Sequence, residues 1–481
     1  MAKIAFIQEE LRDRFGVMLL SACLGEHGHE RDVFVAEKSH DLVSEVKAFK
    51  PDILAFSTMT AGVPFALKTM RELKEATGAM TLMGGPHATF YPEIIGEKGI
   101  DAVCVGEGEG AIVDLANAID RKESIYEIKN LWVKDRENPE KIYRNELRER
   151  TDINALPMFD RDLYFNKYKE LAEAPTKKIF IAKGCPFDCS YCFNHSLKEM
   201  YKGKGKYLQF YTVDRVLDEI RFINEKWGMK WLQIITDTVN VDKSWFMEFM
   251  RRYKEEFNIK YICNVRIDRI DEEIVQMMKE SGCDRVNYGI EHGDSEIRKN
   301  VLKRDMTDEE IIRGGELFTK YGMRVQTANI IGVPHETVET AMSTVRLNRK
   351  VKPDIAQVFI LQPYPKTQIY EYSKNAGFLA PDYIHSVSGT GFQLSFDGSE
   401  NKMQLKLEDE KKLVRLFYLF NFFVQHSWTD RIHKIILAVP FLRLYKMIYM
   451  YPIVKQHFKY GKGVREKLEV LKKFFCNILK G

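Results

Sequence analysis

The chain has 481 residues, of which 45% are hydrophobic and 30% are charged, a balance that is typical of globular proteins and excludes a largely disordered chain. No apolar run reaches the ~18–20 residues that a membrane-spanning helix needs, and the first residues turn acidic before a signal-peptide core forms, so we expect a cytoplasmic protein. The net charge of +4 is unevenly divided, because residues 401–481 carry 17 Lys and Arg against 6 Asp and Glu, which leaves residues 1–400 mildly acidic.

The first part of the chain, residues 1–130, alternates short apolar runs with helical stretches. This alternation predicts an α/β fold with a doubly wound, parallel sheet. The expected strands are 3–8, 31–35, 53–57, 80–83 and 102–105, and the expected helices are 16–24 and 62–76. Ligands bind such sheets where the carboxyl ends of strands meet the following loops, which here are 57–60, 84–89 and 106–109.

A charged segment at 131–172 is interpreted as a linker with a little strand structure. A second strand–helix series fills residues 173–375 and fits a partial (β/α)6 barrel rather than a closed eight-fold one. Its strands are expected near Ile179–Ala182, Trp231–Thr236, Tyr261–Val265, Val286–Gly289, Gln326–Ile331 and Ile355–Leu361. Residues 376–481 lack this alternation, and we expect a mostly helical, basic and aromatic region there.

The strongest chemical signal is a C-x3-C-x2-C loop directly after the first barrel strand, formed by Cys185, Cys189 and Cys192. Three cysteines this close in a reducing compartment indicate metal binding rather than a disulfide. They can hold three irons of a [4Fe-4S] cluster and leave the fourth iron open for a small molecule. The alternative is a zinc site with His195 as the fourth ligand that zinc prefers.

With this loop, residues 173–375 resemble the radical S-adenosylmethionine (SAM) enzymes, and later strand ends follow the order found in that family. The matching segments are Thr236-Asp237, Arg266, Gly289-Ile290-Glu291, Ile331-Gly332-Val333-Pro334 and Gln362-Pro363-Tyr364-Pro365. The resemblance implies that SAM binds the open iron and that an electron from the cluster cleaves it to methionine and a 5′-deoxyadenosyl radical. An electron donor such as ferredoxin or flavodoxin is then an expected partner.

The resemblance also assigns the contacts to SAM. Tyr191 and the pair Ile331 and Gly332 would flank the adenine, while Glu291, Arg266 and Asp237 would lie near the ribose and methionine ends. For Glu291 or Arg266 taken alone, an ordinary ion pair at the barrel mouth is the alternative. One departure concerns the methionine amino group, because Asp237-Thr238-Val239 replaces the Gly-Gly-Glu stretch that is common in the family.

Three motifs follow one another in the first part of the chain: Pro51-Asp52-Ile53 before the third strand, Gly84-Gly85-Pro86-His87 after the fourth and Gly106-Glu107-Gly108-Glu109 after the fifth. With these motifs, residues 3–120 resemble the cobalamin-binding domain of cobalamin-dependent radical SAM enzymes. Glycines let backbone N–H groups approach a large ligand, and Ser and Thr hydroxyls add hydrogen-bond donors. The residues expected to contact cobalamin are Thr58, Thr60, Gly84, Gly85, Pro86, His87, Gly106, Glu107, Gly108 and Glu109. The alternative is a vestigial cobalamin fold that binds nothing.

The loop after the first strand predicts how cobalamin would bind. Domains that ligate cobalt through histidine carry Asp-x-His-x-x-Gly there, whereas this chain has Gln8-Glu9-Glu10-Leu11-Arg12-Asp13. We therefore expect base-off cobalamin with no histidine on its lower face. His87 is expected to contact the corrin or its tail, with cobalt ligation as the less favoured alternative.

The C-terminal region combines aromatic and basic residues. Residues 417–460 hold twelve aromatic side chains, and Pro440 and Pro452 divide the region into helices too short to span a bilayer. An aromatic face with cationic rims is typical of an interfacial helix on anionic lipid. The alternatives are a helical layer that caps the barrel and, ranked last, nucleic-acid binding, since no recognition motif accompanies the charge.

These features together predict a cobalamin-dependent radical SAM methyltransferase that acts on an unactivated centre of a small, hydrophobic substrate, a lipid being one option. The rival within the enzyme class is oxidative ring formation or C–C coupling of the anaerobic porphyrin cyclase type. A rival outside it is a non-catalytic cobalamin sensor, against which the intact cysteine loop argues. We expect a cytoplasmic location that includes the membrane surface, and no nucleic-acid partner.

Overall fold

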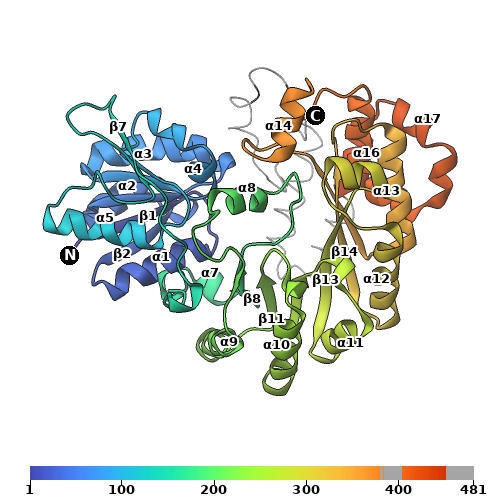
Figure 1. Cartoon of the computed structure of the whole chain (residues 1–481), viewed down its shortest axis with the longest axis horizontal. Helices are drawn as coiled ribbons and strands as arrows, with labels where there is room; N and C mark the ends of the chain where they lie inside the picture. Colours follow the sequence, from blue (N-terminus) through green and yellow to red (C-terminus); the bar gives the residue numbers. More distant parts are fainter. Residues whose placement is uncertain (380–382, 384–402, 451–481) are drawn as a thin grey trace. The chain divides into compact units, whose positions relative to one another are not determined.

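A computed structural model of the chain describes residues 1–379, 383 and 403–450 (Figure 1). The described residues form two compact units. The first unit contains Met1–Gly184 and Leu197–Met229, and the second contains Cys185–Ser196, Lys230–Tyr383 and the described residues from 403 onward. The boundaries 1–130, 131–172, 173–375 and 376–481 stay a prediction.

The predicted parallel sheet of the first unit is confirmed. Its strands follow the order β2-β1-β3-β4-β5-β6-β7, and β1 to β5 are parallel. The parallel strands are β1 (Lys3–Gln8), β2 (Glu30–Val35), β3 (Ile53–Ser57), β4 (Met80–Gly84) and β5 (Ala102–Cys104). Their carboxyl ends therefore lie along one edge of the sheet, where ligand loops are expected.

The segment interpreted as a linker contributes two strands to this sheet. β6 (Leu131–Lys134) pairs antiparallel with β5, and β7 (Ile142–Arg144) pairs antiparallel with β6. In β6 the buried Leu131 and Val133 alternate with half-buried residues, as expected for a strand with one covered face. A little strand structure was expected in this segment, but its high charge did not allow the strands to be located.

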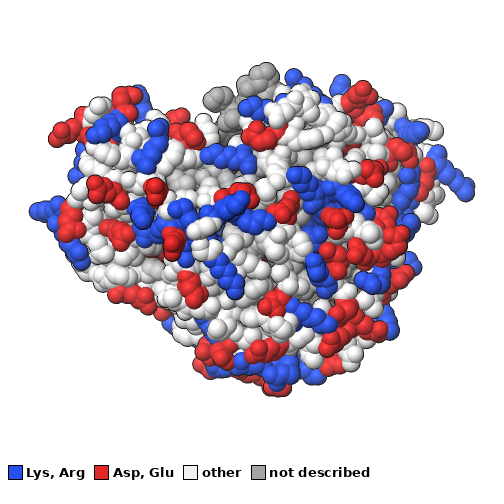
Figure 2. Space-filling model, in the orientation of Figure 1, with Lys and Arg blue, Asp and Glu red and all other residues white. Residues whose placement is uncertain are grey.

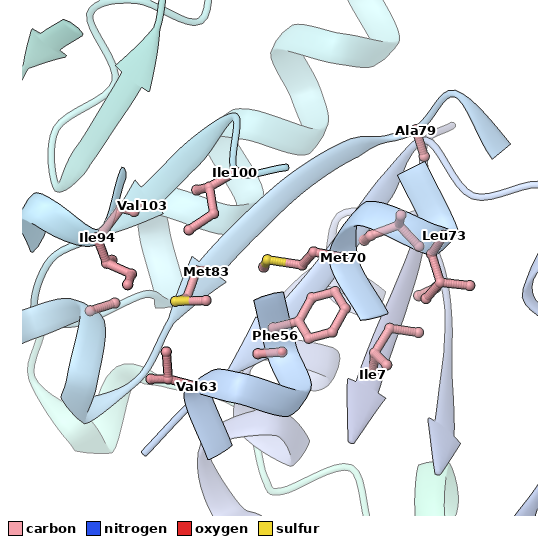
Figure 3. Close-up of a cluster of buried hydrophobic side chains, with 14 of the residues drawn as sticks. Ile7, Phe56, Val63, Met70, Leu73, Ala79, Met83, Ile94, Ile100 and Val103 are labelled. Atoms are coloured by element: carbon pink, nitrogen blue, oxygen red, sulfur yellow. The ribbon is translucent and has the colours of Figure 1, made fainter. Parts of the chain in front are cut away.

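Helices cover both faces of the sheet, because α1 packs on α5 and α2 packs on α3. These helices are α1 (Phe15–Glu26), α2 (Leu42–Phe49), α3 (Val63–Thr77), α4 (Pro86–Phe90) and α5 (Glu109–Arg121). Figure 3 shows Met70 of α3 beside Phe56 and Met83 of the strands, all fully or almost fully buried. Burial of each such side chain contributes about 1.5–3 kcal/mol, so this core holds the strand ends in register.

The rest of the first unit consists of short elements and one long helix. They are α6 (Asp162–Phe165), α7 (Lys169–Ala172), β8 (Thr176–Phe180), β9 (Ala182–Lys183), β10 (Gln209–Phe210) and α9 (Val213–Trp227). β9 and β10 pair antiparallel. All six strands predicted for 173–375 occur, the first of them as β8.

The second unit contains the other five predicted strands, which form parallel neighbours in the order β11-β12-β13-β14-β15. The strands are β11 (Trp231–Ile235), β12 (Lys260–Asn264), β13 (Cys283–Glu291), β14 (Arg324–Ile331) and β15 (Ile355–Ile360). A helix follows each strand, as the partial barrel predicts: α10 (Lys243–Glu256), α11 (Glu272–Glu280), α12 (Asp308–Lys320), α13 (Val338–Val351) and α14 (Gln368–Asn375).

Each of these five helices begins at a side chain that satisfies a free backbone N–H group. The caps are Asp242, Asp271, Thr307, Thr337 and Thr367. Thr307 and Glu310 form a full capping box, with each side chain accepting from the backbone N–H of the other. Because a cap contributes roughly 1 kcal/mol, these residues fix where each strand loop ends.

The C-terminal region is helical over its described part, as predicted. α16 (Glu410–Gln425) packs on α13 and β15, and α17 (His433–Ala438) packs on α16. Residues 442–450 are also helical, whereas the predicted segment at 451–481 lies outside the described residues. Within the described part of the chain, every helix is too short or too polar to cross a membrane.

Candidate cluster and cofactor sites

The cysteine loop runs from Gly184, which has a φ of +91°, to the start of α8 (Phe193–Met200). Cys189 is buried, and Cys185 and Cys192 are partly accessible. Ser190 ties the loop to its surroundings, because its backbone N–H and its Oγ donate to the carbonyls of Leu302 and Val301 at 3.0 and 2.6 Å. The protein backbone itself therefore sets the conformation of the loop.

Two arginines lie beside the sulfur of Cys189. Nη1 of Arg304 is 3.7 Å and Nη1 of Arg266 is 4.0 Å from Cys189 Sγ. Both arginines are buried, with 8% and 5% of their surface exposed. At Cys192 the neighbour is neutral, since Asn194 Nδ2 lies 3.6 Å from its sulfur. Positive charge is thus concentrated at one of the three cysteines.

The other two cysteines lack this compensation. Burial is the main reason that the pKa of the Cys185 thiol is raised to about 11, and burial also raises the pKa of Cys192. Because metal binding requires the thiolate, cluster assembly on this loop releases protons.

Arg304 joins several predicted contacts to SAM, although the sequence did not single it out. Its Nη1 lies 3.4 Å from the Tyr191 hydroxyl and 3.7 Å from Glu291 Oε1, and its Nη2 donates to the carbonyl of Gly289 at 2.7 Å. A basic residue between two predicted elements is too common a pattern to be recognised from one sequence. Tyr191, Glu291 and Cys189 therefore lie around one residue, Arg304, that the sequence analysis did not identify.

Glu291 ends β13 in a left-handed conformation, with a φ of +67°, at a shift in the strand register. Its side chain lies over Gly289, where an added Cβ would be 1.9 Å from Glu291 Oε1. Burial raises the pKa of the Glu291 carboxyl, and Arg304 opposes that rise. A carboxylate held in this strained position, with a positive neighbour, is well placed to accept hydrogen bonds from a ligand.

Asp237 follows β11. Its side chain reaches solvent, but nearby protein displaces part of the water around the carboxyl group. This loss of water raises the pKa of Asp237, while a hydrogen bond from Asn194 lowers it. Asn194 also contacts Cys192, so Asp237 is linked to the cysteine loop through one side chain.

The segment at Ile331 and Gly332 is held by a buried acid. Glu336 Oε2 accepts from the backbone N–H groups of Gly332 and Val333, and its Oε1 lies 2.9 Å from His292 Nε2. The Ile331 side chain is fully buried in the core beneath α13 and α16, which leaves the backbone of this segment for a cofactor contact. The His292–Glu336 pair fixes the two loops that carry Glu291 and Gly332.

His195 already has partners at both ring nitrogens. Nδ1 lies 3.1 Å from Asp188 Oδ1, and Nε2 lies 2.5 Å from Gln368 Nε2. Among the residues that the structure describes, no three His, Cys, Asp or Glu side chains converge closely enough to hold a single metal ion. Each cysteine of a [4Fe-4S] cluster binds a different iron, so three cysteines are enough for three of its four irons.

In the first unit, the loops after β3 and β4 contact one another directly. Thr58 N–H donates to the carbonyl of Gly84 at 2.9 Å, and His87 N–H donates to the carbonyl of Thr58 at 3.0 Å. Gly85 has a φ of +87°, and a Cβ there would be 2.7 Å from Thr58 N. The glycine is therefore required by the neighbouring loop, while Pro86 beside it is exposed.

The loop from Gly106 to Glu109 makes buried ion pairs within the first unit. Glu107 Oε1 accepts from Arg150 Nε at 3.0 Å, and Glu109 Oε1 accepts from Lys183 Nζ at 2.5 Å. Tyr201 OH accepts from Glu107 N–H at 2.7 Å and also occupies the space beside Gly106. Gly108 lies against Leu20. Both carboxylates predicted to contact cobalamin thus have protein partners.

His87 retains an unsatisfied atom. Its Nδ1 lies 3.2 Å from Thr60 Oγ1, whereas its buried Nε2 has no hydrogen-bond partner among the described residues. Burial lowers the pKa of His87 to about 4, so the ring is neutral at pH 7. A neutral nitrogen without a partner, next to the strand ends, fits a ligand contact at this edge of the sheet.

Two family models match the chain. The model of the B12 binding domain matches residues 13–116, and that of the radical SAM superfamily matches residues 179–347. The chain thus has the domains of a radical SAM enzyme preceded by a cobalamin-binding domain. It belongs to the cobalamin-dependent radical SAM enzymes, and its cofactors are a [4Fe-4S] cluster, SAM and cobalamin.

Curated relatives and a solved structure agree with this assignment. The chain is 29% identical over 337 residues to the uncharacterized methyltransferase PH0819 of Pyrococcus horikoshii, covering 69% of this chain and 72% of that one. It is 24% identical over 371 residues to the anaerobic magnesium-protoporphyrin IX monomethyl ester cyclase of Rubrivivax gelatinosus, covering 74% and 65%. The structure of the cobalamin-dependent radical enzyme OxsB has the same fold, with a TM-score of 0.70 at 13% identity and coverage of 99% and 72%.

The residues present fit these cofactors. The three cysteines would supply three ligands to a [4Fe-4S] cluster, which would provide the electron for SAM cleavage, and the two arginines at Cys189 would offset its negative charge. Glu291, Tyr191 and Asp237 would offer polar atoms to SAM. His87 and the loop of Thr58 would offer them to cobalamin, which would supply methyl-transfer chemistry.

Proposed function

We propose that this enzyme transfers a methyl group to an unactivated carbon or phosphorus centre of a small molecule. The observation that supports this is the combination of both domains with a methyltransferase, PH0819, among the relatives that align over more than two thirds of their length. The buried Arg304–Glu291–Tyr191 group supports the SAM side of the proposal, since it assembles polar atoms next to the cysteine loop.

Oxidative cyclisation or C–C coupling is the second candidate, because a magnesium-protoporphyrin cyclase aligns with most of the chain. The discriminating experiment is anaerobic incubation of the reconstituted enzyme with SAM, a reductant and cobalamin. Deoxyadenosine together with S-adenosylhomocysteine supports methyl transfer. Deoxyadenosine without S-adenosylhomocysteine supports the cyclase type. If neither product forms, the non-catalytic cobalamin sensor is the hypothesis that remains.

Cobalamin is proposed to bind base-off, without a protein nitrogen on cobalt. The support is that the loop after β1 has no histidine and that Gln8 holds it internally, with Gln8 Nε2 donating to the carbonyls of Glu10 and Arg12. Electron paramagnetic resonance of the Co(II) form tests this. Nitrogen hyperfine splitting would contradict it, and its absence in both wild type and His87→Ala would agree with it.

A hydrophobic or lipid substrate, and a location at the membrane surface, belong to the same proposal. What supports them is the exposed apolar and basic surface of the C-terminal helices. An external electron donor such as ferredoxin or flavodoxin is also proposed, because cluster chemistry of this kind consumes an electron. The SAM contacts assigned to Asp237, Arg266, Ile331 and Gly332, and the cobalamin contacts of the first unit, are proposals as well.

A further inference from the structure

Exposed apolar side chains are concentrated in one short stretch of the second unit. Eleven large hydrophobic side chains are exposed among the described residues, and six of them lie within residues 428–447. We call these six the C-terminal apolar face: Trp428, Ile432, Ile435, Phe441, Leu444 and Met447. Exposure reaches 66% at Ile435 and 62% at Phe441. Single exposed hydrophobic residues are ordinary, but a concentration of this kind marks an interaction surface.

The face is a fixed feature of the helices rather than the result of a loose segment. On the opposite side, Leu437 and Tyr445 are buried in the core with α16 and α13. The Tyr445 hydroxyl donates to the carbonyls of Ile436 and Val439 at 2.7 and 3.1 Å, and Arg415 Nη1 donates to that of Leu437 at 2.6 Å. The inner side of these helices is already buried, so the outer side packs against no further core among the described residues.

The spacing of the exposed residues places them on one side of each helix. Ile432 and Ile435 are three residues apart, as are Phe441, Leu444 and Met447, which is close to one helical turn. A helix that is apolar on both its buried and its outward side is unusual at a water-exposed surface. Such a helix is expected where its outward side contacts another apolar environment, such as a partner or a bilayer.

Basic side chains accompany the face, and the acidic residue within residues 428–447, Asp430, is paired with Arg349 Nη1 at 2.6 Å. Arg431, Lys434 and Arg443 are exposed, and Lys446 lies 6.0 Å from the ring of Tyr418. Residues 431–450 contain no Asp or Glu. Figure 2 shows basic side chains projecting from the edge at which Figure 1 draws α17, while elsewhere on that view both signs are interspersed.

The combination of apolar and basic residues selects among the possible occupants. A second copy of the face would oppose arginines and lysines with the same charges, which disfavours self-association. Nucleic-acid bases stack on aromatic rings, but four of the six side chains are aliphatic or methionine. An anionic bilayer satisfies both features, because its headgroups attract the cations and its acyl region accepts the apolar side chains.

We propose that the C-terminal apolar face and its basic neighbours dock the enzyme on anionic lipid bilayers as a peripheral protein. The full-length reconstituted enzyme should sediment with vesicles of phosphatidylcholine that contain phosphatidylglycerol, and less with pure phosphatidylcholine. Raising the salt toward 1 M shortens the Debye length to ~3 Å and should release part of the bound protein. The fraction of protein that stays bound at high salt measures the insertion of apolar side chains into the bilayer.

Two variants separate the two components. Lys434→Gln with Arg443→Gln should weaken binding to the anionic vesicles about fivefold for each charge removed. Ile435→Glu with Phe441→Glu should abolish the salt-resistant part, because it places carboxylates in the inserted face. The matched control is Phe222→Glu, another exposed phenylalanine, which lies in α9 of the first unit and is 42% exposed. It should bind as wild type does.

Several outcomes would overturn the proposal. They are no sedimentation at low salt, equal binding to neutral and anionic vesicles, or equal losses in the Phe222 control. Oligomer formation that disappears in the Ile435 and Phe441 variant, without vesicle binding, would show that a second copy covers the face instead. Iron content and the circular dichroism spectrum verify that each variant is folded. The readout needs no turnover, so it stands or fails independently of the methyl-transfer proposal.

Discussion

In the second unit, buried arginines turn toward a cysteine of the cluster loop, whereas in the first unit the charged residues of a cofactor loop turn toward protein partners. Cys189 has Arg304 and Arg266 within 4.0 Å, while Glu107 and Glu109 are paired with Arg150 and Lys183. Both arrangements bury charge, and burial of charge is costly unless it is compensated. Protein carboxylates compensate the cations in both units, because Glu291 lies 3.7 Å from Arg304 and Asp268 lies 2.8 Å from Arg266. The difference is that the two arginines also face the sulfur of a predicted cluster ligand.

This contrast teaches how to interpret motif residues. A glycine or carboxylate in a recognised loop can serve the fold, as Gly85 and Glu109 do, and still be taken for a ligand contact. A buried polar atom without a hydrogen-bond partner among the described residues, such as Arg304 Nε or His87 Nε2, points more directly to a ligand. The predictions below test that distinction from both sides.

The largest effect is expected at the cysteine loop itself. Cys185→Ala, Cys189→Ala or Cys192→Ala should each abolish deoxyadenosine formation and lower the iron content, because three thiolates are needed to hold the cluster with one iron open. Cys263→Ala, at a buried core cysteine on β12, is the control and should keep its iron. Reductive SAM cleavage by the triple alanine variant would refute the assignment.

Arg304 should tune the cluster rather than hold it. A unit charge about 4 Å away contributes on the order of 4 kcal/mol at an effective dielectric constant of about 20, which is an upper limit for its effect on reduction. Arg304→Gln should make the reduction potential of the cluster more negative, because it removes the positive charge. Arg304→Lys keeps the charge and should leave the potential close to that of wild type. The iron content should stay unchanged in both variants. A redox titration followed by electron paramagnetic resonance measures this.

The control for that titration is Arg269→Gln, since Arg269 is exposed and lies 5.9 Å from the ring of Phe187, so water screens its charge. If the Arg304→Gln and Arg269→Gln variants shift the potential equally, the proximity of Arg304 to Cys189 has no special role. If the Arg304→Gln variant loses its iron, Arg304 is structural.

In the first unit, Glu109→Gln should act on stability. Glu109 and Lys183 are almost buried, and removing one partner of a buried pair leaves the other charge uncompensated, at a cost of about 3 kcal/mol. Urea unfolding of the full chain measures the loss. Glu72→Gln, in the exposed pair with Lys68, should cost less than about 1 kcal/mol. A weaker affinity for cobalamin with unchanged stability would instead make Glu109 a ligand contact.

The architecture was predictable because it depends on patterns that repeat along the chain. The apolar runs that became β1 to β5 and β11 to β15 mark strands wherever they occur, and the cysteine spacing marks the cluster loop by itself. Arg304, His292 and Glu336 were not predictable, since their roles arise only when loops distant in sequence meet. Some strand structure was expected in the charged segment that holds β6 and β7, but their positions and pairing were not predictable, because short edge strands can carry as much charge as a linker.

The smallest effect is expected from His87, and it depends on pH. Its pKa is lowered from 6.5 to about 4 in the folded chain, so the unfolded chain binds more protons between these values. The free energy of unfolding therefore rises with pH in this window and falls as the pH is lowered from 6.5 toward 4. At about 1.4 kcal/mol per pH unit, His87 alone accounts for a loss of roughly 2 kcal/mol between pH 7 and pH 5.

His87→Gln should remove that part of the pH dependence while leaving the stability at pH 7 little changed, because Gln does not titrate. Urea unfolding of wild type and variant at both pH values gives the difference, with His40→Gln as the control at an exposed position. Bound cobalamin should enlarge the pH dependence, because a ligand held by the neutral ring adds to the cost of protonation. An identical pH dependence in wild type and His87→Gln would show that the ring is not protected from protons, and would remove His87 from the cofactor edge of the sheet.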